Sequence, residues 1–116
     1  MSSIYEILTA AAIPSQAARF PDPPEIHAVY FDSIDTAGLD NSDLGTALQA
    51  RHDCTVELYA PSIKVGDSAL TRVKEQLEAR GIRYTTQGWY WLSTIQRYQE
   101  VVEFTYIEKI NRRTNQ

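Results

Sequence analysis

The sequence predicts an α+β fold in which a mainly antiparallel or mixed β-sheet carries two α-helices packed on one face. Segments with the alternating pattern of strands outnumber segments with helical periodicity. The two helical segments stand far apart in the chain, so their order does not follow the regular alternation of βαβ units. Two amphipathic helices cover only one face of such a sheet, and we expect the other face to meet water or another molecule.

The chain has 116 residues, which suits one domain with a single core. We expect residues 1–107 to form this domain and residues 108–116 to form a polar, disordered tail. With 43% hydrophobic and 22% charged residues, the composition is that of a soluble globular protein. No apolar run approaches the roughly 20 residues of a membrane span, so we expect no membrane contact.

Charge and cysteine content narrow the class of function. A formal net charge of -4 argues against nucleic acid as the main partner, because phosphate binding favours a basic surface. The single cysteine excludes an internal disulfide and any CxxC-type metal or redox site, which fits a reducing compartment. The chain has no GxGxxG or GxxxxGK motif, so the sequence predicts no cofactor.

The first helix is predicted to begin at a capping box. Ser3 and Glu6 have the spacing at which each side chain bonds a backbone amide left free at a helix start. The helix should run to about Ala12, where a proline two residues later prevents its continuation. Residues 16–20 favour a short strand, and the proline-rich stretch 21–24 then keeps the backbone extended.

Two strands are predicted in the first half of the chain. Residues 26–34 are mostly β-branched, aromatic or small, which favours a strand. Residues 51–59 alternate between apolar and polar positions, and the apolar side chains on one face are Cys54, Val56 and Leu58. Residues 35–45 carry glycines and aspartates and predict a loop, whereas residues 46–50 either continue the following strand or are separated from it by a bulge.

The second helix is predicted over residues 68–80. Its apolar stripe consists of Leu70, Val73 and Leu77. Breakers at residues 66–67 precede it, and Gly81 after the last turn is the predicted C-cap, closed by a hydrophobic contact of the next residue. We expect Leu77 and Leu58 both to be buried where this helix packs on the central strand.

The last third of the chain is predicted to be mainly strand. Residues 82–86 favour a strand, residues 87–88 suit a turn, and the aromatic run at residues 89–92 then favours a hairpin. Residues 98–107 predict a final strand, in which the side chains that share one face are Val102, Phe104 and Tyr106.

The residue types of a catalytic triad occur together at His52, Asp53 and Cys54. Adjacent residues of a strand point to opposite faces, so these three side chains do not converge on one substrate. His27 would meet His52 only across neighbouring strands, with Asp32 or Asp53 as a further metal ligand, and no third ligand stands at a recognisable spacing. The sequence therefore predicts no enzyme activity, no catalytic residue and no metal ligand.

Aromatic side chains gather near the end of the chain, at Trp89, Tyr90, Trp91, Tyr98 and Tyr106. Three interpretations are open. One side of these strands enters the core, or exposed aromatics form a protein interface, in which Trp and Tyr are enriched. A stacking platform for single-stranded nucleic acid ranks last, because few basic residues lie nearby.

The chain resembles a family of phage and prophage tail-completion proteins, the tail terminators and tail-to-head joining proteins. The resemblance runs from Ile4 to about Ile107 and departs in the tail at residues 108–116 and in an extended loop at residues 35–45. The pieces that carry it, in order, are Ile4-Tyr5, Ile13-Pro14, Arg19-Phe20, Pro23-Pro24, Val29-Tyr30, Asp40-Asn41, Val56-Glu57-Leu58-Tyr59, Gly81-Ile82, Tyr98-Gln99 and Val102-Glu103-Phe104.

The resemblance implies a structural role without catalytic residues. Subunits of this family close into a ring, typically a hexamer, that caps the tail tube and presents a surface to the neck of the head. The partners it implies are further copies of the chain, the tail-tube protein and a neck or head-completion protein, first in the host cytoplasm and then in the virion tail. The candidate interface residues are Asp40, Asn41, Asp43, Ile63, Lys64, Trp89 and Trp91.

A second function class agrees with the same residues. The chain would then be a head-side connector in the neck, or a monomeric protein-binding module of a prophage. Mass in solution separates the monomeric module from a ring, because a head-to-tail contact between identical subunits closes into a ring when its rotation permits.

Overall fold

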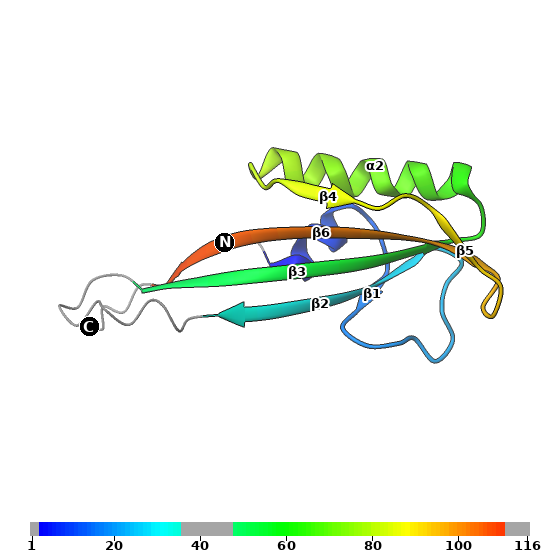
Figure 1. The fold of residues 1–116 in the computed structure, drawn as a ribbon, viewed down its shortest axis with the longest axis horizontal. Coiled ribbons are helices and arrows are strands. Elements are labelled where there is room, and N and C mark those ends of the chain that lie inside the picture. Colours follow the sequence, from blue (N-terminus) through cyan, green and yellow to red (C-terminus); the bar gives the residue numbers. More distant parts are fainter. Residues whose placement is uncertain (1–2, 36–47, 111–116) are drawn as a thin grey trace.

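The computed structural model describes residues 3–35 and 48–110 and shows a six-stranded mixed sheet with two helices (Figure 1). The predicted α+β class is confirmed. The elements follow the chain in the order α1 (Ile4–Ala10), β1 (Ser15–Gln16), β2 (His27–Asp35), β3 (Leu48–Ala60), α2 (Ile63–Ala79), β4 (Tyr84–Thr86), β5 (Tyr90–Leu92) and β6 (Arg97–Ile110).

Three long antiparallel strands form the centre of the sheet. The strand order is β1-β2-β3-β6-β4, and β5 pairs with β6 as well. The short β1 runs parallel to β2, whereas every other pair is antiparallel. At one end, β2, β3 and β6 extend beyond both helices as a three-stranded ribbon (Figure 1).

The core joins both helices to the sheet. Buried residues of α1 and α2 form one cluster with Cys54, Val56 and Leu58 of β3, which share one face as predicted. Leu58 and Leu77 are both 0% exposed, which confirms the expectation for the central packing. In Figure 1, α2 runs alongside β4 while α1 lies behind the sheet.

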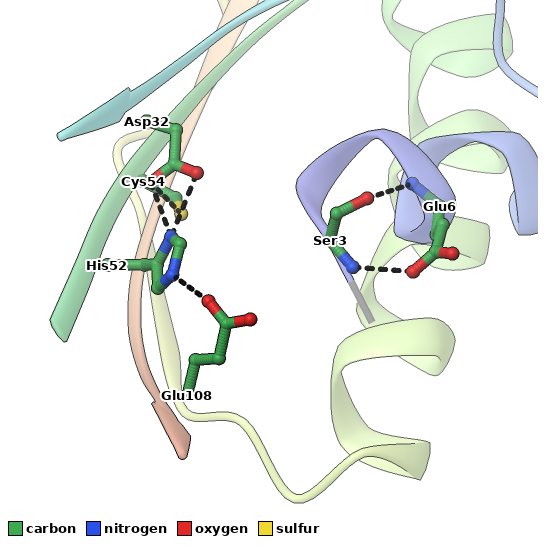
Figure 2. A network of polar contacts seen from close by, with 6 residues as sticks. All are labelled: Ser3, Glu6, Asp32, His52, Cys54 and Glu108. Atoms are coloured by element: carbon green, nitrogen blue, oxygen red, sulfur yellow. Dashed lines mark hydrogen bonds and ion pairs between the residues drawn. The ribbon is translucent and has the colours of Figure 1, made fainter. Parts of the chain in front are cut away.

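The predicted capping box begins α1 (Figure 2). The Ser3 hydroxyl accepts a hydrogen bond from the Glu6 amide at 3.1 Å, and the Ser3 amide donates to the Glu6 carboxylate at 2.7 Å. The helix ends at Ala10, two residues earlier than predicted, because the chain turns through Ala12 with a φ of 60°. The strand predicted at residues 16–20 is only the two-residue β1, since the following residues leave the sheet.

The predicted break at residues 66–67 is wrong, because α2 continues through it. The helix begins at Ile63 after the N-cap Ser62, whose hydroxyl accepts from the Val65 amide at 3.2 Å. Gly66 lies inside the helix where its backbone approaches the ring of Trp89, so this glycine serves packing and not a turn.

The predicted C-cap of α2 is confirmed. Gly81 has a φ of +70°, its amide donates to the Glu78 carbonyl at 3.0 Å, and the Ile82 amide donates to the Leu77 carbonyl at 2.9 Å. These two bonds are those of a Schellman motif. Ile82 also packs against the core, as expected for the residue that closes the terminus.

The predicted hairpin between residues 82–86 and 89–92 is wrong, because β4 and β5 both pair with β6 and not with each other. The connection between them is held by Glu100, which is 2% exposed. Its carboxylate accepts hydrogen bonds from the amides of Gln87 and Gly88 at 2.8 and 2.9 Å. Between β4 and β5, hydrogen bonds to this carboxylate thus replace backbone pairing with β6.

The strands β3 and β6 pair with each other, and both are longer than predicted. Residues 46–50 were predicted either to continue the following strand or to be separated from it by a bulge. β3 is continuous from Leu48, so residues 48–50 continue the strand. Leu48 pairs with Ile110, so β6 runs three residues beyond the predicted end at Ile107 and into the predicted polar tail. Of the predicted loop at residues 35–45, only Asp35 lies among the described residues, where it ends β2.

Candidate functional site

The sheet has a second face opposite the core cluster, and none of the clustered helix residues lies on it among the described residues. We call it the helix-free face. The strand register places Phe31, Thr55 and Glu103 in one row of this face, and Asp35, Arg51 and Ile107 in another. Phe31 and Ile107 are each 49% exposed, and Tyr90 at the same face is 68% exposed. Large apolar side chains open to solvent on an uncovered sheet face are typical of a surface that meets another protein.

A groove of about 460 Å³ lies at one end of this face. Its walls come from three separate parts of the chain: the segment after β1, the first half of β2 with β3, and the turn between β5 and β6. The lining side chains that matter most for binding are Arg19, Phe20, Phe31, Ile95 and Arg97. Apolar walls with a few polar groups are the usual composition of a binding groove.

His27 holds one wall of the groove in place. Its Nδ1 donates to the Pro24 carbonyl at 2.9 Å, and its ring stacks on Tyr59 with centroids 4.8 Å apart. Phe20 meets the same ring edge-on at 5.1 Å. Burial lowers the pKa of His27, and the nearby charge of Arg97 lowers it further, against the opposite effect of the Pro24 hydrogen bond. The segment around residues 20–24 is therefore attached to the sheet through a neutral imidazole.

Arg97 brings an unsatisfied donor to the groove. Its Nη1 donates to the Gln96 carbonyl at 3.0 Å, whereas its Nε is buried and has no hydrogen-bond partner. Among the described residues, no carboxylate lies within ion-pair distance of Arg97 or of Arg19. Arg97 is half-buried and lines the groove, so its guanidinium gives this wall a positive charge.

A polar cluster joins the three long strands at the other end of the sheet (Figure 2). Nδ1 of His52 lies 2.9 Å from both carboxylate oxygens of Asp32, and Nε2 lies 2.8 Å from Glu108. Ionised carboxylates only accept, so below its raised pKa the ring donates from both nitrogens as an imidazolium. The ring also stacks on Tyr106 with centroids 4.4 Å apart.

The environment of His52 favours its charged form. Burial lowers its pKa, but the hydrogen bonds to Asp32 and Glu108 and the charges of these two carboxylates outweigh burial and raise it overall. The three residues come from β2, β3 and β6, so the cluster acts as an electrostatic clamp across the ribbon.

The cluster does not assemble an activated nucleophile. Nε2 of His52 faces Glu108 and not a hydroxyl or a thiol. The Cys54 thiol lies 3.7 Å from Asp32, and burial and the charge of Asp32 raise its pKa to about 12, so it stays protonated near neutral pH. Asp53 is exposed on the opposite face, as predicted for adjacent strand residues.

The two histidines do not meet. The register places His27 beside Tyr59 on the helix-free face and His52 beside Tyr106 on the core face. Within residues 3–35 and 48–110, no group of three or more His, Cys, Asp and Glu side chains is arranged to hold a metal ion.

Four of the seven predicted interface residues lie among the described residues. Asp40, Asn41 and Asp43 lie outside the described residues. Ile63 and Lys64 form the exposed first turn of α2.

The two tryptophans divide between the core and the surface. Trp89 packs against the core and donates from its Nε1 to Asp67 at 2.7 Å, whereas Trp91 is exposed and its ring lies 4.8 Å from that of Tyr98. Gly66 brings Trp89 next to the start of α2, so the predicted residues at Ile63 and Trp89 belong to one end of the molecule.

Sequence reasoning missed the groove residues Phe31, Ile95 and Arg97 as a group. Each looks ordinary in its own segment, and only the register of β2, β3 and β6 brings them together. The one available signal was the alternation of side chains along residues 26–34. It places Phe31 on the face away from the core.

Comparisons with protein-family models, characterised proteins and solved structures find no match for this chain. Among the described residues, no helix is both long enough and apolar enough to cross a membrane. The family resemblance therefore stays a prediction, and the surface geometry is the basis for a proposal of function.

Proposed function

We propose that this protein is a structural assembly protein of a phage or prophage, which forms a ring that caps the tail tube and joins it to the head. The family resemblance implies a hexamer. The observation that carries the proposal is the helix-free sheet face with its exposed Phe31, Tyr90 and Ile107. Exposed apolar side chains gathered on one sheet face are typical of a surface that binds another protein.

The remaining features agree with a binding role and assign no chemistry to the chain. The polar cluster around His52 uses both ring nitrogens for carboxylates and therefore acts within the fold. The resemblance to tail-completion proteins covers most of the chain and carries no catalytic residue. Its expected partners are further copies of this chain, the tail-tube protein and a neck protein.

The proposed ring needs a contact between two different patches of identical subunits. The helix-free face and the exposed start of α2 at Ile63 and Lys64 are different patches of the described residues. Loss of translational freedom and ordering of side chains oppose association, so we expect weak self-association in dilute solution and stronger association on a tail tube.

The test is sedimentation analysis over a wide concentration range, with and without assembled tail-tube protein. The proposal expects concentration-dependent association toward a ring and binding to tube ends. Reversing the charge at Asp40 and Asp43 should weaken association or docking while thermal unfolding stays unchanged. A strict monomer that also ignores assembled tubes would contradict the proposal and would favour the monomeric binding module.

A further inference from the structure

The groove that Arg97 lines lies at one end of the helix-free face. Its apolar walls include Phe20, Phe31 and Ile95. Its charged residues are Arg19, Arg97 and Glu57, and the Glu57 carboxylate accepts a hydrogen bond from the Tyr59 hydroxyl at 2.9 Å, so the groove carries a net positive charge. A fitting ligand would place an apolar side chain between the aromatic walls and an oxygen acceptor on Arg97.

We propose that this groove binds residues 36–47 from a second copy of this chain, with leucine side chains in the apolar hollow and aspartates on the two arginines. The inference rests on the proposed ring and names one of its contacts. Residues 36–47 contain no basic side chain, and their complementary residues are Leu39, Asp40, Asp43 and Leu44. The acidic segment thus matches the net positive charge that Arg19, Arg97 and Glu57 give the groove, and its two leucines match the apolar walls.

The geometry of the ribbon argues for a second copy over the chain's own segment. Residues 36–47 connect Asp35 at the end of β2 to Leu48 at the start of β3. A segment of this length that goes out and back reaches at most about 21 Å. Arg97 lies one position beyond the Tyr98–Ala60 pair and thus about ten ladder positions from Asp35, a distance of roughly 33 Å.

The contact also has the form that a ring requires. The groove lies near the start of β2, and residues 36–47 join the other end of the same strand. The groove and the segment are therefore different parts of the chain, so each subunit can offer its segment to one neighbour and its groove to another.

The direct test measures binding of a synthetic peptide with the sequence of residues 36–47 to the full chain, by fluorescence anisotropy at dilute, monomeric concentrations. We expect saturable binding that weakens at least roughly tenfold in Arg97→Gln, because a desolvated charge pair is lost. Arg83→Gln is the control, since Arg83 is exposed beside β4 and outside the groove.

Arg19→Gln provides a second variant in case Arg97→Gln does not fold, because Arg19 is exposed in the segment after β1. A peptide with both aspartates changed to asparagine should bind more weakly than the native peptide. The proposal is overturned if the native peptide does not bind, or if Arg97→Gln and Arg19→Gln bind it as well as the Arg83→Gln control.

A mixing experiment tests the contact between whole chains. Arg97→Glu reverses a charge that the groove needs and leaves the segment unchanged. Asp40→Lys with Asp43→Lys reverses the charges of the segment and leaves the groove unchanged. Neither chain should self-associate, and their mixture should form one-to-one pairs that do not grow. If the mixture forms no pairs while wild-type chains still assemble on tail tubes, this contact is overturned. The proposed ring would still stand.

Discussion

The two buried histidines respond to pH in opposite directions. The pKa of His52 is raised by Asp32 and Glu108 against the effect of burial, and the pKa of His27 is lowered, mainly by burial. Folding therefore favours the charged form of His52 and the neutral form of His27. The two effects act on opposite sides of about pH 6.5, so replacing one histidine leaves the pH dependence that belongs to the other.

The first prediction separates these effects. The contribution of His52 is complete below about pH 6.5, its unfolded value, and is lost as the pH rises through the raised folded pKa. The contribution of His27 is complete above that value and is lost as the pH falls toward the lowered folded pKa. Urea unfolding of His27→Ala should therefore show stability that falls as the pH rises from about 6.5, and His52→Ala should show the reverse.

Near pH 6, His52→Ala should also lower the free energy of unfolding by about 1–3 kcal/mol, because it removes hydrogen bonds to two charged groups. Both partners retain some contact with water, since the side chains of Asp32 and Glu108 are 24% and 35% exposed. Parallel pH profiles for the two variants would contradict the clamp across the ribbon.

At the scale of elements, α2 depends on a residue with poor helix propensity. A Cβ added at Gly66 would lie 2.5 Å from two ring carbons of Trp89, a separation that real contacts do not show. Alanine is better than glycine inside a helix by about 1 kcal/mol, so propensity and packing act in opposite directions at this position.

The second prediction is that packing outweighs propensity. Gly66→Ala should lower the free energy of unfolding by about 1–3 kcal/mol, the usual cost of overpacking. In a Trp89→Ala background the clash is absent, and the same change should stabilise the protein by up to about 1 kcal/mol. Thermal or denaturant unfolding of the four chains in this cycle measures both values. Additive effects would show that Trp89 does not pack on this turn.

The third prediction concerns the attachment of α2 to β3. Leu77→Ala should cost about 2–5 kcal/mol, as large-to-small changes in a core do, because Leu77 and Leu58 are both fully buried. Glu75→Ala on the exposed side of the same helix is the control. A shift in denaturant unfolding below about 0.5 kcal/mol for Leu77→Ala would be a surface-level effect and would contradict this packing.

For the whole molecule, the two faces of the projecting ribbon should differ in function. Ile107 lies on the helix-free face and is 49% exposed, whereas Ile34 lies on the opposite face and is 58% exposed. These residues have the same side chain, similar exposure and neighbouring positions along the ribbon. They therefore form a matched pair for testing which face meets a partner.

The fourth prediction is that Ile107→Ser weakens association several-fold and that Ile34→Ser has little effect on it, since only the first removes apolar area from the proposed contact face. Both changes affect exposed side chains, so unfolding should shift by about 0.5 kcal/mol or less. Sedimentation of both variants at equal concentration gives the comparison. Equal association of both variants would remove the helix-free face from the proposed interface.

Local patterns in the sequence determined the capping box at Ser3, the C-cap at Gly81, the strand faces around Val56 and the burial of Leu77, because each depends on neighbouring residues and on the period of one element. The α+β class follows from the same patterns.

Tertiary structure decided the features that depend on contacts between distant segments. Gly66 was predicted to break the chain, but its place against Trp89 keeps it in the helix. The buried carboxylate of Glu100 replaces the predicted hairpin, and the register of β2, β3 and β6 assembles both the His52 clamp and the groove at Arg97. No local pattern encodes these pairings, because their partners lie tens of residues apart and meet only when the sheet forms.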